Sequence, residues 1–455
     1  MAIESLNPST GERLATFPEM PAGEVDAIVD AAVLAQRAWA RLPFERRAEP
    51  MRRVAVLLRE RAPELARLMA LEMGKPLRDG QAEVAKCAGA CEWNAEHAAR
   101  LLAPRVEASD ASRSMVRFDP LGVVLAVMPW NFPFWQVFRF IAPHLMAGNG
   151  GLLKHASNVP QCALAIEALM RDAGFPPALF RTLLVGAGRV APLIEDPRIA
   201  AVTLTGSEPA GRAVAAVAGR ALKPSVLELG GSDPFIVLAD ADLEQAAKTA
   251  AVARTINAGQ SCICAKRFIV EAPVHDAFLE RLTAAMRAVR VGDPLDPATD
   301  IGPQARRELR DELHGQVTQA IAGGARPVLG CELPAGPGAF YPPSVLADVL
   351  PDNLAAREEL FGPVAAVLRA GSDEEAVDLA NASRFGLGAS LWTRSEERIA
   401  RLVPRIEAGA VFVNGMVKSD PRLPFGGVKA SGYGRELALY GAREFTNIKT
   451  LWTAP

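Results

Sequence analysis

One cysteine lies in a segment whose composition suits chemistry. Cys262 ends the sequence Gly-Gln-Ser-Cys at 259–262, a small polar run that contains a glycine. A turn of this kind leaves a thiol accessible in a way that a core cysteine is not, and an accessible thiolate can be a nucleophile. The alternative is a cysteine that packs as a small hydrophobe. No histidine or aspartate lies near it in the sequence, so a cysteine hydrolase would need tertiary contacts.

Two polar side chains follow apolar runs that have the character of buried strands. Asn131, in Pro-Trp-Asn-Phe-Pro, follows the run 122–128 and could donate a hydrogen bond to an oxyanion, or cap the next helix. Glu228, in Glu-Leu-Gly-Gly, ends the run 225–228. A carboxylate beside two glycines suits a general base near a close backbone approach, or an ion pair at a domain boundary.

Three more segments have the composition of functional loops. Each of the first two is weak evidence for a functional loop when taken alone. They are Glu-Glu-Leu-Phe-Gly-Pro at 358–363 and Pro-Phe-Gly-Gly-Val-Lys at 424–429. The third, Gly-Ala-Gly-Arg-Val-Ala at 186–191, fits the dinucleotide pattern G-x-G-x-x-A. That pattern also requires an acidic residue ~20 positions later, where this chain has Thr-Gly-Ser at 205–207. Phosphate binding and a plain tight turn both stay open.

Alternating apolar runs and helical patterns supply the framework for these loops. The runs typical of strands are 122–128, 151–154, 181–185, 201–204, 225–228, 235–238 and 267–271. The helical patterns between them are 136–147, 160–173, 189–195, 208–221, 242–254 and 274–288. Strands that alternate with helices predict doubly wound parallel sheets, with ligands at the carboxyl ends of the strands.

The two ends of the chain add helices and strands. Helical spacing covers 24–39, 45–73 and 79–100, and residues 115–118 alternate as in a strand. The terminal segment 444–452 also has the composition of a strand. A terminal strand needs a partner edge, either within the chain or in an oligomer.

The overall composition excludes several classes of function. The chain has 455 residues, which predicts two or three domains, and 50 basic against 52 acidic residues. No basic excess indicates a nucleic-acid or membrane partner, and no apolar run reaches the ~18 residues of a membrane span. Six cysteines and five histidines show neither a disulfide scaffold nor a zinc pattern. We expect no metal and a cytoplasmic location.

Taken together, in this order and spacing, the motifs resemble the NAD(P)-dependent aldehyde dehydrogenase superfamily over essentially the whole chain. The segments Lys-His-Ala-Ser-Asn at 154–158 and 414–427 are further similar to bacterial succinate-semialdehyde dehydrogenases. The resemblance implies an α/β fold with two Rossmann-like parallel-sheet domains and a small β oligomerisation arm. The implied parts are a nucleotide-binding domain at 1–100 and 120–229, a catalytic domain at 230–437, and an arm at 101–119 and 438–455.

The resemblance implies a role for each central side chain. Cys262 would attack an aldehyde to form a thiohemiacetal and then a thioester. Asn131 and the backbone N–H of Cys262 would hold the oxyanion, and a mobile Glu228 would activate the hydrolytic water. The implied reaction is oxidation of succinic semialdehyde to succinate by a homodimer or homotetramer. The alternatives are glutarate semialdehyde or an aliphatic aldehyde as substrate, a cysteine hydrolase without nicotinamide, and a non-catalytic protein with this fold.

The same matching implies a cofactor site. Lys154 would face the adenine ribose, Glu359 would bind the nicotinamide ribose, and Phe361 would pack near the nicotinamide ring. The pyrophosphate region and its surroundings would comprise Trp130, Gly206 and Ser207, so the glycine-rich turn at 186–191 would not bind phosphate.

A departure from the family concerns the choice between NADP and NAD. Ser157 stands where many members have a glutamate, which repels a 2′-phosphate. Repulsion between unit charges at ~4 Å is on the order of 4 kcal/mol near a protein surface. Its absence favours NADP, with NAD still possible.

The far end of the substrate has several possible ligands. Arg139 matches an arginine that binds the substrate carboxylate in succinate-semialdehyde members, although a helical arginine can equally form a salt bridge. A second arginine of some members is replaced by Ile256. Among Lys418, Ser419 and Arg422, which could substitute for it, we favour Ser419 as a hydrogen-bond donor.

Cys264 suggests a redox switch. In an extended segment residues i and i+2 face the same side with Cα atoms ~6.6 Å apart, so a bond from Cys262 to Cys264 would be strained and easily reduced. Alternatively, Cys264 fills a small apolar space.

Overall fold

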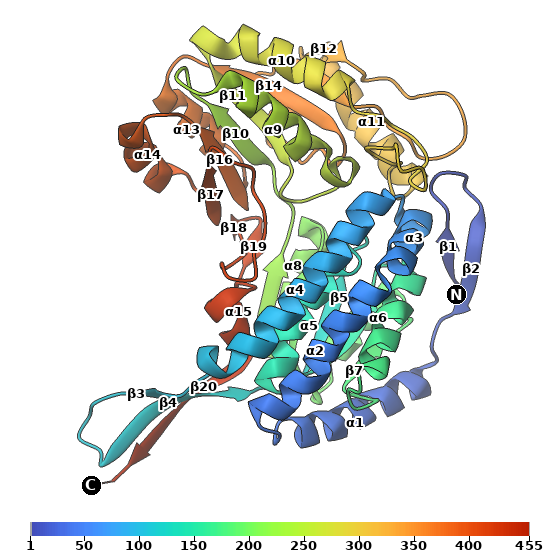
Figure 1. The fold of residues 1–455 in the computed structure, drawn as a ribbon, viewed down its shortest axis with the longest axis vertical. Coiled ribbons are helices and arrows are strands. Elements are labelled where there is room, and N and C mark those ends of the chain that lie inside the picture. Colours follow the sequence, from blue (N-terminus) through green and yellow to red (C-terminus); the bar gives the residue numbers. More distant parts are fainter. Residues whose placement is uncertain (1, 455) are drawn as a thin grey trace.

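The computed structural model describes residues 2–454 and contains two lobes, each built on a largely parallel sheet (Figure 1). The sheet of the first lobe has the strand order β19-β9-β8-β5-β6-β7. Its strands are β5 (Val123–Met128), β6 (Gly150–His155), β7 (Phe180–Thr182), β8 (Ile199–Thr205), β9 (Ser225–Glu228) and β19 (Gly432–Tyr433). Only the pairing of β19 with β9 is antiparallel. The carboxyl ends of β5, β6, β8 and β9 therefore meet at one edge.

Helices cover both faces of this first sheet. Alternate residues of β5 enter two different hydrophobic clusters, with Val124 and Ala126 in one and Val123 and Leu125 in the other. The first cluster is completed by α2 (Phe44–Glu60), α3 (Ala62–Met73), α4 (Leu77–Leu101), α5 (Trp135–Ala147) and α6 (Pro160–Asp172). The second is completed by α1 (Ala22–Trp39), α7 (Val190–Glu195) and α8 (Glu208–Arg220). This is the doubly wound arrangement predicted for the alternating segments.

The second lobe has a seven-stranded sheet in the order β12-β13-β14-β11-β10-β16-β17. Its strands are β10 (Asp233–Val237), β11 (Ala265–Glu271), β12 (Arg326–Leu329), β13 (Ser344–Ala347), β14 (Val364–Ala370), β16 (Gly388–Trp392) and β17 (Ala410–Val413). One face packs on α9 (Leu243–Thr255) and α10 (His275–Arg287). The other packs on α11 (Arg307–Ala322), α12 (Leu354–Arg357), α13 (Asp373–Asn381) and α14 (Glu396–Leu402). Every neighbouring pair is parallel except β12 with β13.

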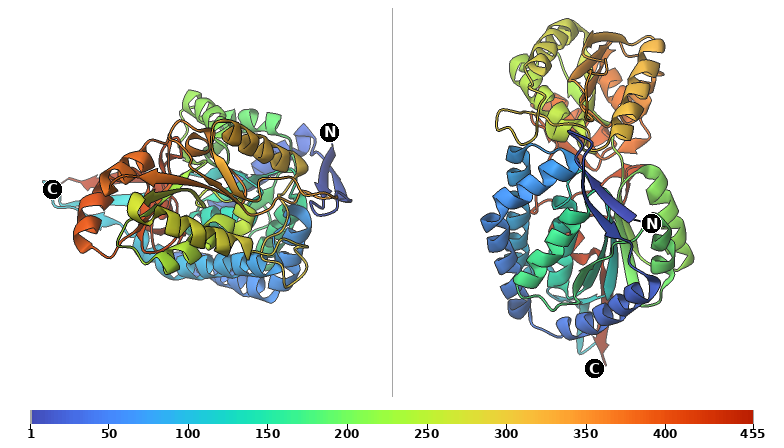
Figure 2. Two further views of the ribbon diagram at one scale, coloured as in Figure 1. Left: turned by 90° about the horizontal axis from the view of Figure 1, so that it is seen from above. Right: turned by 90° about the vertical axis from the view of Figure 1, so that its right-hand side faces the viewer.

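Smaller elements surround the lobes. They are the hairpin β1 (Ala2–Leu6) and β2 (Arg13–Pro18), the pair β15 (Phe385–Gly386) and β18 (Val428–Lys429), helix α15 (Ala438–Glu444), and the 3-10 turns η1 (Ala187–Arg189), η2 (Ile256–Gly259), η3 (Ala272–Val274) and η4 (Val403–Arg405). Figure 2 shows the two lobes end to end, with the N-terminal hairpin beside their junction. Within residues 2–454, no helix combines the length and the apolar character that a membrane crossing requires.

A three-stranded sheet projects away from both lobes (Figure 1). It contains β3 (Arg105–Val106), β4 (Arg113–Pro120) and β20 (Thr446–Thr453), in the order β20-β4-β3. Strand β20 pairs antiparallel with β4 from Thr446 opposite Pro120 to Thr453 opposite Arg113. The terminal strand therefore finds its partner within the chain, which was one of the two alternatives.

Two expected elements differ from the observed ones. The helical pattern at 45–73 is divided into α2 and α3 at Arg61. Pro63 lies in the first turn of α3 and has no N–H with which to continue the hydrogen bonds of α2. The strand expected at 181–185 is only β7, and residues 183–186 after it lie outside any strand.

Candidate active site

Cys262 lies in a strained loop between α9 and β11 of the second lobe. Asn257 and Ala258 both have left-handed backbone angles, with φ of 52° and 55°, and Gly259 follows with φ 76°. Such angles cost ~1–3 kcal/mol for a residue other than glycine and cluster at functional sites. A Cβ atom at Gly259 would lie 2.2 Å from the carbonyl carbon of Gly362, so the loop packs directly on the segment before β14.

Asn131 comes from the first lobe, in the loop after β5, and contacts the nucleophile loop. Its Nδ2 donates to the backbone oxygen of Gln260 at 3.1 Å, and Nδ2 of Asn257 donates to the backbone oxygen of Asn131 at 2.7 Å. A side-chain amide has two hydrogens, so one remains for an oxyanion. The structure thus joins the loops that carry Cys262 and Asn131.

A buried ion pair between Lys75 and Glu83 holds the Asn131 loop in place through hydrogen bonds to its backbone. Lys75 pairs with Glu83 and donates from Nζ to the backbone oxygen of Asn131 at 3.0 Å. Glu83 Oε1 accepts the backbone N–H groups of Phe134 and Trp135, each at 2.9 Å, at the start of α5. No sequence pattern distinguishes this pair, because a lysine and a glutamate near an amphipathic helix are ordinary until the fold buries them.

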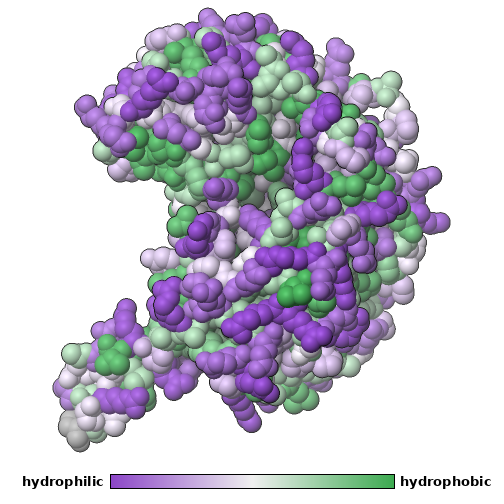
Figure 3. All heavy atoms as spheres, viewed as in Figure 1, coloured by the Kyte–Doolittle hydropathy of each residue, from purple (hydrophilic) through white to green (hydrophobic). Residues whose placement is uncertain are grey.

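Two cavities meet at Cys262, and the surface of the molecule is indented between the two lobes (Figure 3). The smaller cavity, of about 250 Å³, is lined by Lys75, Asp79, Ala82, Glu83, Lys86, Phe132, Trp135, Gln136, Arg139, Ile256, Asn257, Ser261, Cys262, Ile263, Ser419 and Phe425. The larger one, of about 570 Å³, shares Gln136 and Cys262 with it and lies in the range of ligand sites. A thiol at this junction can touch the contents of both.

The larger cavity contains most residues of the expected cofactor site, namely Trp130, Gly206, Ser207, Glu359 and Phe361. Ser207 is the N-cap of α8, so the unpaired N–H groups of that helix suit a phosphate. Lys154 is the last residue but one of β6, and Ser157 lies exposed just beyond this strand. Neither residue lines the larger cavity. No residue of 186–191 lines the cavity within the part of the chain that the structure describes.

Lys266 links the cofactor side of the site to the nucleophile. Its Nζ lies 3.1 Å from Glu359 Oε1, which also accepts the backbone N–H of Gly231. The same Nζ donates to the backbone oxygens of Ser261 and Cys262, at 2.8 Å and 2.7 Å. Sequence reasoning missed this lysine because it lies inside the buried strand β11, where the pattern indicates only packing.

The surroundings of Cys262 favour the protonated form of its thiol. Burial raises the pKa of Cys262 to about 12, against the lowering effect of the cations Lys266 and Arg139. At neutral pH the sulfur must therefore lose a proton as it attacks a carbon.

Glu228 is buried at the end of β9, and neither of its carboxyl oxygens has a hydrogen-bond partner. Burial raises the pKa of Glu228 to about 8; Arg139 opposes the rise and Glu436 adds to it. The side chain lines neither cavity. It can serve as a base only after moving toward the thiol, so the predicted mobility of Glu228 stays a prediction.

Arg139 lines the smaller cavity as expected, but it already has partners. It forms a buried ion pair with Glu436, donates from Nη2 to Thr205 Oγ1 at 3.2 Å, and lies 4.7 Å from the ring centroid of Phe425. Glu436 follows the Pro-Phe-Gly-Gly-Val-Lys segment by seven residues, and this place beside a functional loop is the signal that could have found it. The charge of Arg139 is balanced before any substrate enters.

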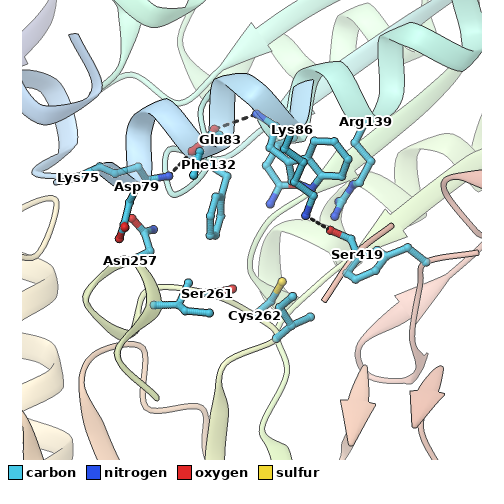
Figure 4. Close-up of a pocket in the computed structure, with 16 residues that line it drawn as sticks. Lys75, Asp79, Glu83, Lys86, Phe132, Arg139, Asn257, Ser261, Cys262 and Ser419 are labelled. Atoms are coloured by element: carbon cyan, nitrogen blue, oxygen red, sulfur yellow. Dashed lines mark hydrogen bonds and ion pairs between the residues drawn. The ribbon is translucent and has the colours of Figure 1, made fainter. Parts of the chain in front are cut away.

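Ser419 also lines the smaller cavity, and its hydroxyl accepts a hydrogen bond from Nζ of Lys86 at 2.6 Å (Figure 4). The two alternatives to it do not line this cavity: Lys418 is exposed, and Arg422 pairs with Asp420 at 2.6 Å. Lys86 gave no signal in the sequence beyond its place on a long amphipathic helix.

The extended segment assumed for the two cysteines is wrong. Residues 262 and 263 form a turn, and the backbone N–H of Cys264 bonds back to the oxygen of Ser261 at 3.1 Å. Cys264 is buried with its sulfur 3.6 Å from the backbone oxygen of Ile256, and both thiols are free. The spacing argument for a strained bond depended on extended geometry, so the redox switch loses that support.

Comparisons with known proteins agree over the whole chain. Residues 1–451 match the family model described as Aldehyde dehydrogenase family. A protein of Synechocystis sp. named probable succinate-semialdehyde dehydrogenase, NADP(+), is 54% identical over 454 residues, which cover 100% of both chains. A Mycobacterium bovis protein named succinate-semialdehyde dehydrogenase 1, NADP(+), is 52% identical over 459 residues, again covering 100% of both. The crystal structure of a Streptococcus pyogenes succinic semialdehyde dehydrogenase in complex with NADP+ superposes with a TM-score of 0.97 at 36% identity, covering 100% of both chains.

Proposed function

Because the chain belongs to the aldehyde dehydrogenase family, we propose that it oxidises succinic semialdehyde to succinate with NADP as its cofactor. The observation that carries the proposal is the position of Cys262, where a dinucleotide-sized cavity meets a small cavity with cationic side chains. The full-length relatives named for this substrate and for NADP support it, and so does the neighbouring structure that contains NADP+. The expected family and fold class are confirmed.

The first half of the reaction depends on the two loops that meet at the thiol. The Cys262 thiol gives its proton to water as its sulfur bonds to the aldehyde carbon. The π pair of the carbonyl moves to the oxygen, and the product is a thiohemiacetal oxyanion on the sulfur. Asn131 Nδ2 and the backbone N–H of Cys262 stabilise the oxyanion, and one such donor contributes ~3–4 kcal/mol in the transition state.

The residues of the larger cavity fit a dinucleotide. Trp130, Gly206 and Ser207 would hold the pyrophosphate region beside the N-terminus of α8, and Glu359 and Phe361 would bind the nicotinamide end near Cys262. When bound, NADP supplies a hydride acceptor. Lys154 and Ser157 would reach the adenosine end from the strand next to β5.

The second half of the reaction releases the acid. After the carbon on Cys262 is oxidised to a thioester, a water molecule must attack that carbon. Glu228, swung out of its buried position, takes the proton of this water, and the carbon–sulfur bond breaks to give the carboxylate and restore the thiol.

Ser157 sets the preference between the two dinucleotides. Replacing Ser157 with glutamate places a carboxylate beside the 2′-phosphate, and each pair of unit charges at 4 Å costs ~1 kcal/mol in water and ~4 kcal/mol near a protein surface. We expect kcat/KM for NADP to fall by at least about tenfold, while that for NAD changes little. Steady-state kinetics with both cofactors measures this, with Ser157→Ala as the neutral control. Equal losses for the two cofactors would contradict the assignment.

Initial rates of NADPH formation test the proposed function. The substrates are succinic semialdehyde, glutarate semialdehyde and butanal, each with NADP and with NAD. The proposal predicts the highest kcat/KM for succinic semialdehyde with NADP. A higher kcat/KM for butanal or glutarate semialdehyde would show that succinic semialdehyde is not the preferred substrate. Hydrolysis of esters without any aldehyde oxidation would favour a cysteine hydrolase.

The projecting sheet is the part of the chain we propose for assembly into a homodimer or homotetramer. Its apolar side chains Val106, Ile448 and Trp452 are 75%, 67% and 48% exposed, and solvent-exposed apolar groups on a projecting sheet suit burial against another copy. Light scattering should give two or four times the chain mass of 48.4 kDa. A mass of one chain at micromolar concentration would refute this assembly.

A further inference from the structure

Lys86 is a cavity-lining cation that the reaction described above does not use. It projects from α4 into the smaller cavity, on the same side as Arg139 and Ser419 and facing Cys262 across the space (Figure 4). Its Nζ donates to Ser419 Oγ at 2.6 Å and lies 4.2 Å from the ring centroid of Trp135. The ammonium group is therefore held in place on the wall of the cavity.

The other cations of this cavity are neutralised by partners. Lys75 pairs with Glu83, and Arg139 pairs with Glu436, and all four side chains are buried. Among residues 2–454, Lys86 forms no ion pair. The remaining acid of the lining, Asp79, lies at the Lys75 end of the cavity, away from Lys86 (Figure 4). The Lys86 end thus holds a positive charge without a counter-ion.

The unpaired charge and the hydroxyl beside it make a carboxylate site. We propose that Lys86, with Ser419, binds the distal carboxylate of a semialdehyde whose aldehyde carbon lies at Cys262. The inference rests on the proposed function and names the residue that selects its substrate class.

Hydrogen-bonding capacity supports this assignment. An ammonium group has three donors, of which Ser419 takes one, and the Ser419 hydroxyl keeps its own hydrogen to donate. Charge-assisted hydrogen bonds to a carboxylate are about twice as strong as neutral ones. Arg139 lines the same end and can add a contact, but its charge is already balanced by Glu436, so Lys86 provides the net attraction.

The proton on Lys86 should make this recognition depend on pH. Burial and the nearby Arg139 lower the pKa of Lys86 to about 8, while Cys87, Glu83 and Asp420 oppose the shift. Above pH 8 the free enzyme loses the ammonium proton and with it the attraction for a carboxylate. The ratio of kcat/KM for succinic semialdehyde to that for butanal should therefore fall as pH rises from 7 to 9.5. Ionisation of Glu228 and Cys262 changes kcat/KM for both substrates alike, so these effects cancel in the ratio.

The test compares Lys86→Met, Lys86→Arg and wild type on succinic semialdehyde and butanal with saturating NADP. Loss of hydrogen bonds to a charged group predicts a fall of about 10- to 100-fold in the ratio of the two kcat/KM values for Lys86→Met. The loss should lie mainly in KM for the semialdehyde, and Lys86→Arg should keep most of the preference. Lys248→Met, at an exposed lysine on α9, is the matched control and should leave both values unchanged.

The possible results separate this inference from the proposed function. If wild type prefers succinic semialdehyde and Lys86→Met keeps that preference at every pH, the assignment of Lys86 is wrong and the proposed function stands. If wild type oxidises butanal better, or oxidises neither aldehyde, both fail. A ratio that stays flat from pH 7 to 9.5 overturns the predicted pH dependence. If Lys86→Met does not fold, Lys86→Gln takes its place with the same expected loss of preference, and an unchanged preference in that variant overturns the role.

Discussion

Replacing Cys262 with alanine is expected to abolish aldehyde-dependent NADPH formation. Without the sulfur no covalent intermediate can form, and removal of a catalytic nucleophile elsewhere costs on the order of 10⁴- to 10⁶-fold in kcat. The cavities should persist, because the change removes one sulfur atom and keeps every other residue that lines them. Steady-state rates with succinic semialdehyde and NADP measure the loss.

Cys264→Ala is the matched control for this variant. Cys264 is a neighbouring thiol in the same loop, but it is buried with its sulfur at a backbone oxygen and lines neither cavity. The control should keep a rate within a few-fold of wild type. If Cys262→Ala retained a tenth of the wild-type rate, or if the two variants lost activity equally, covalent catalysis at Cys262 would be wrong.

Glu228→Gln is expected to lower the steady-state rate by about 10²- to 10⁴-fold, the usual contribution of a general base. The loss should fall on release of the acid rather than on oxidation, because the glutamate is assigned to the water that attacks the thioester. Rapid mixing of the variant with succinic semialdehyde and NADP should then show a burst of about one NADPH per active site before the slow steady state. A variant that loses the burst as well would place Glu228 in the oxidation step instead.

The same residue predicts the direction of the pH profile. The pKa of Glu228 is raised to about 8, so the basic carboxylate forms as pH rises through that value and is lost below it. Because the buried carboxyl must lose this proton before the side chain moves to the water as a base, the rate of acid release in wild type should increase with pH and level off above about 8. In Glu228→Gln this rise should be absent. An unchanged rise in the variant would assign it to another group, such as the Cys262 thiol.

Sequence reasoning could identify the central residues because each lies in a short loop with a distinctive composition. Asn131 and Glu228 follow apolar runs, and the carboxyl ends of parallel strands share one edge, so their proximity was predictable. Cys262 was distinctive through its neighbours Gly259 and Ser261. The resemblance to a known family then assigned the roles that spacing alone left open.

The supporting cations could not be found in the same way. Lys86 and Lys75 belong to a region of helices, and only the packing of α4 against α5 places them beside the Asn131 loop and the smaller cavity. Lys266 lies in a buried strand, where alternation predicts packing and not an ion pair with Glu359. Contacts of this kind join segments that are far apart in the chain, so the sequence pattern around each residue does not indicate them.

The wrong expectation about the two cysteines has a local cause. The spacing of Cys262 and Cys264 was interpreted as extended, but the left-handed backbone at Asn257 and Ala258 leads into a turn. Arg139 was assigned to the substrate through the family resemblance, with a salt bridge as the alternative, and its local sequence does not indicate that Glu436 pairs with it from the far end of the chain. Its contribution to carboxylate binding stays a prediction.

The central claim is that this protein oxidises succinic semialdehyde through the Cys262 thiol. The most direct measurement is the stoichiometry of a complete reaction of wild-type protein with NADP, in which succinate and NADPH are both quantified, beside Cys262→Ala under the same conditions. We expect one succinate and one NADPH for each semialdehyde consumed by wild type, and neither product from the variant. Succinate formed without NADPH, or both products formed by Cys262→Ala, would contradict it.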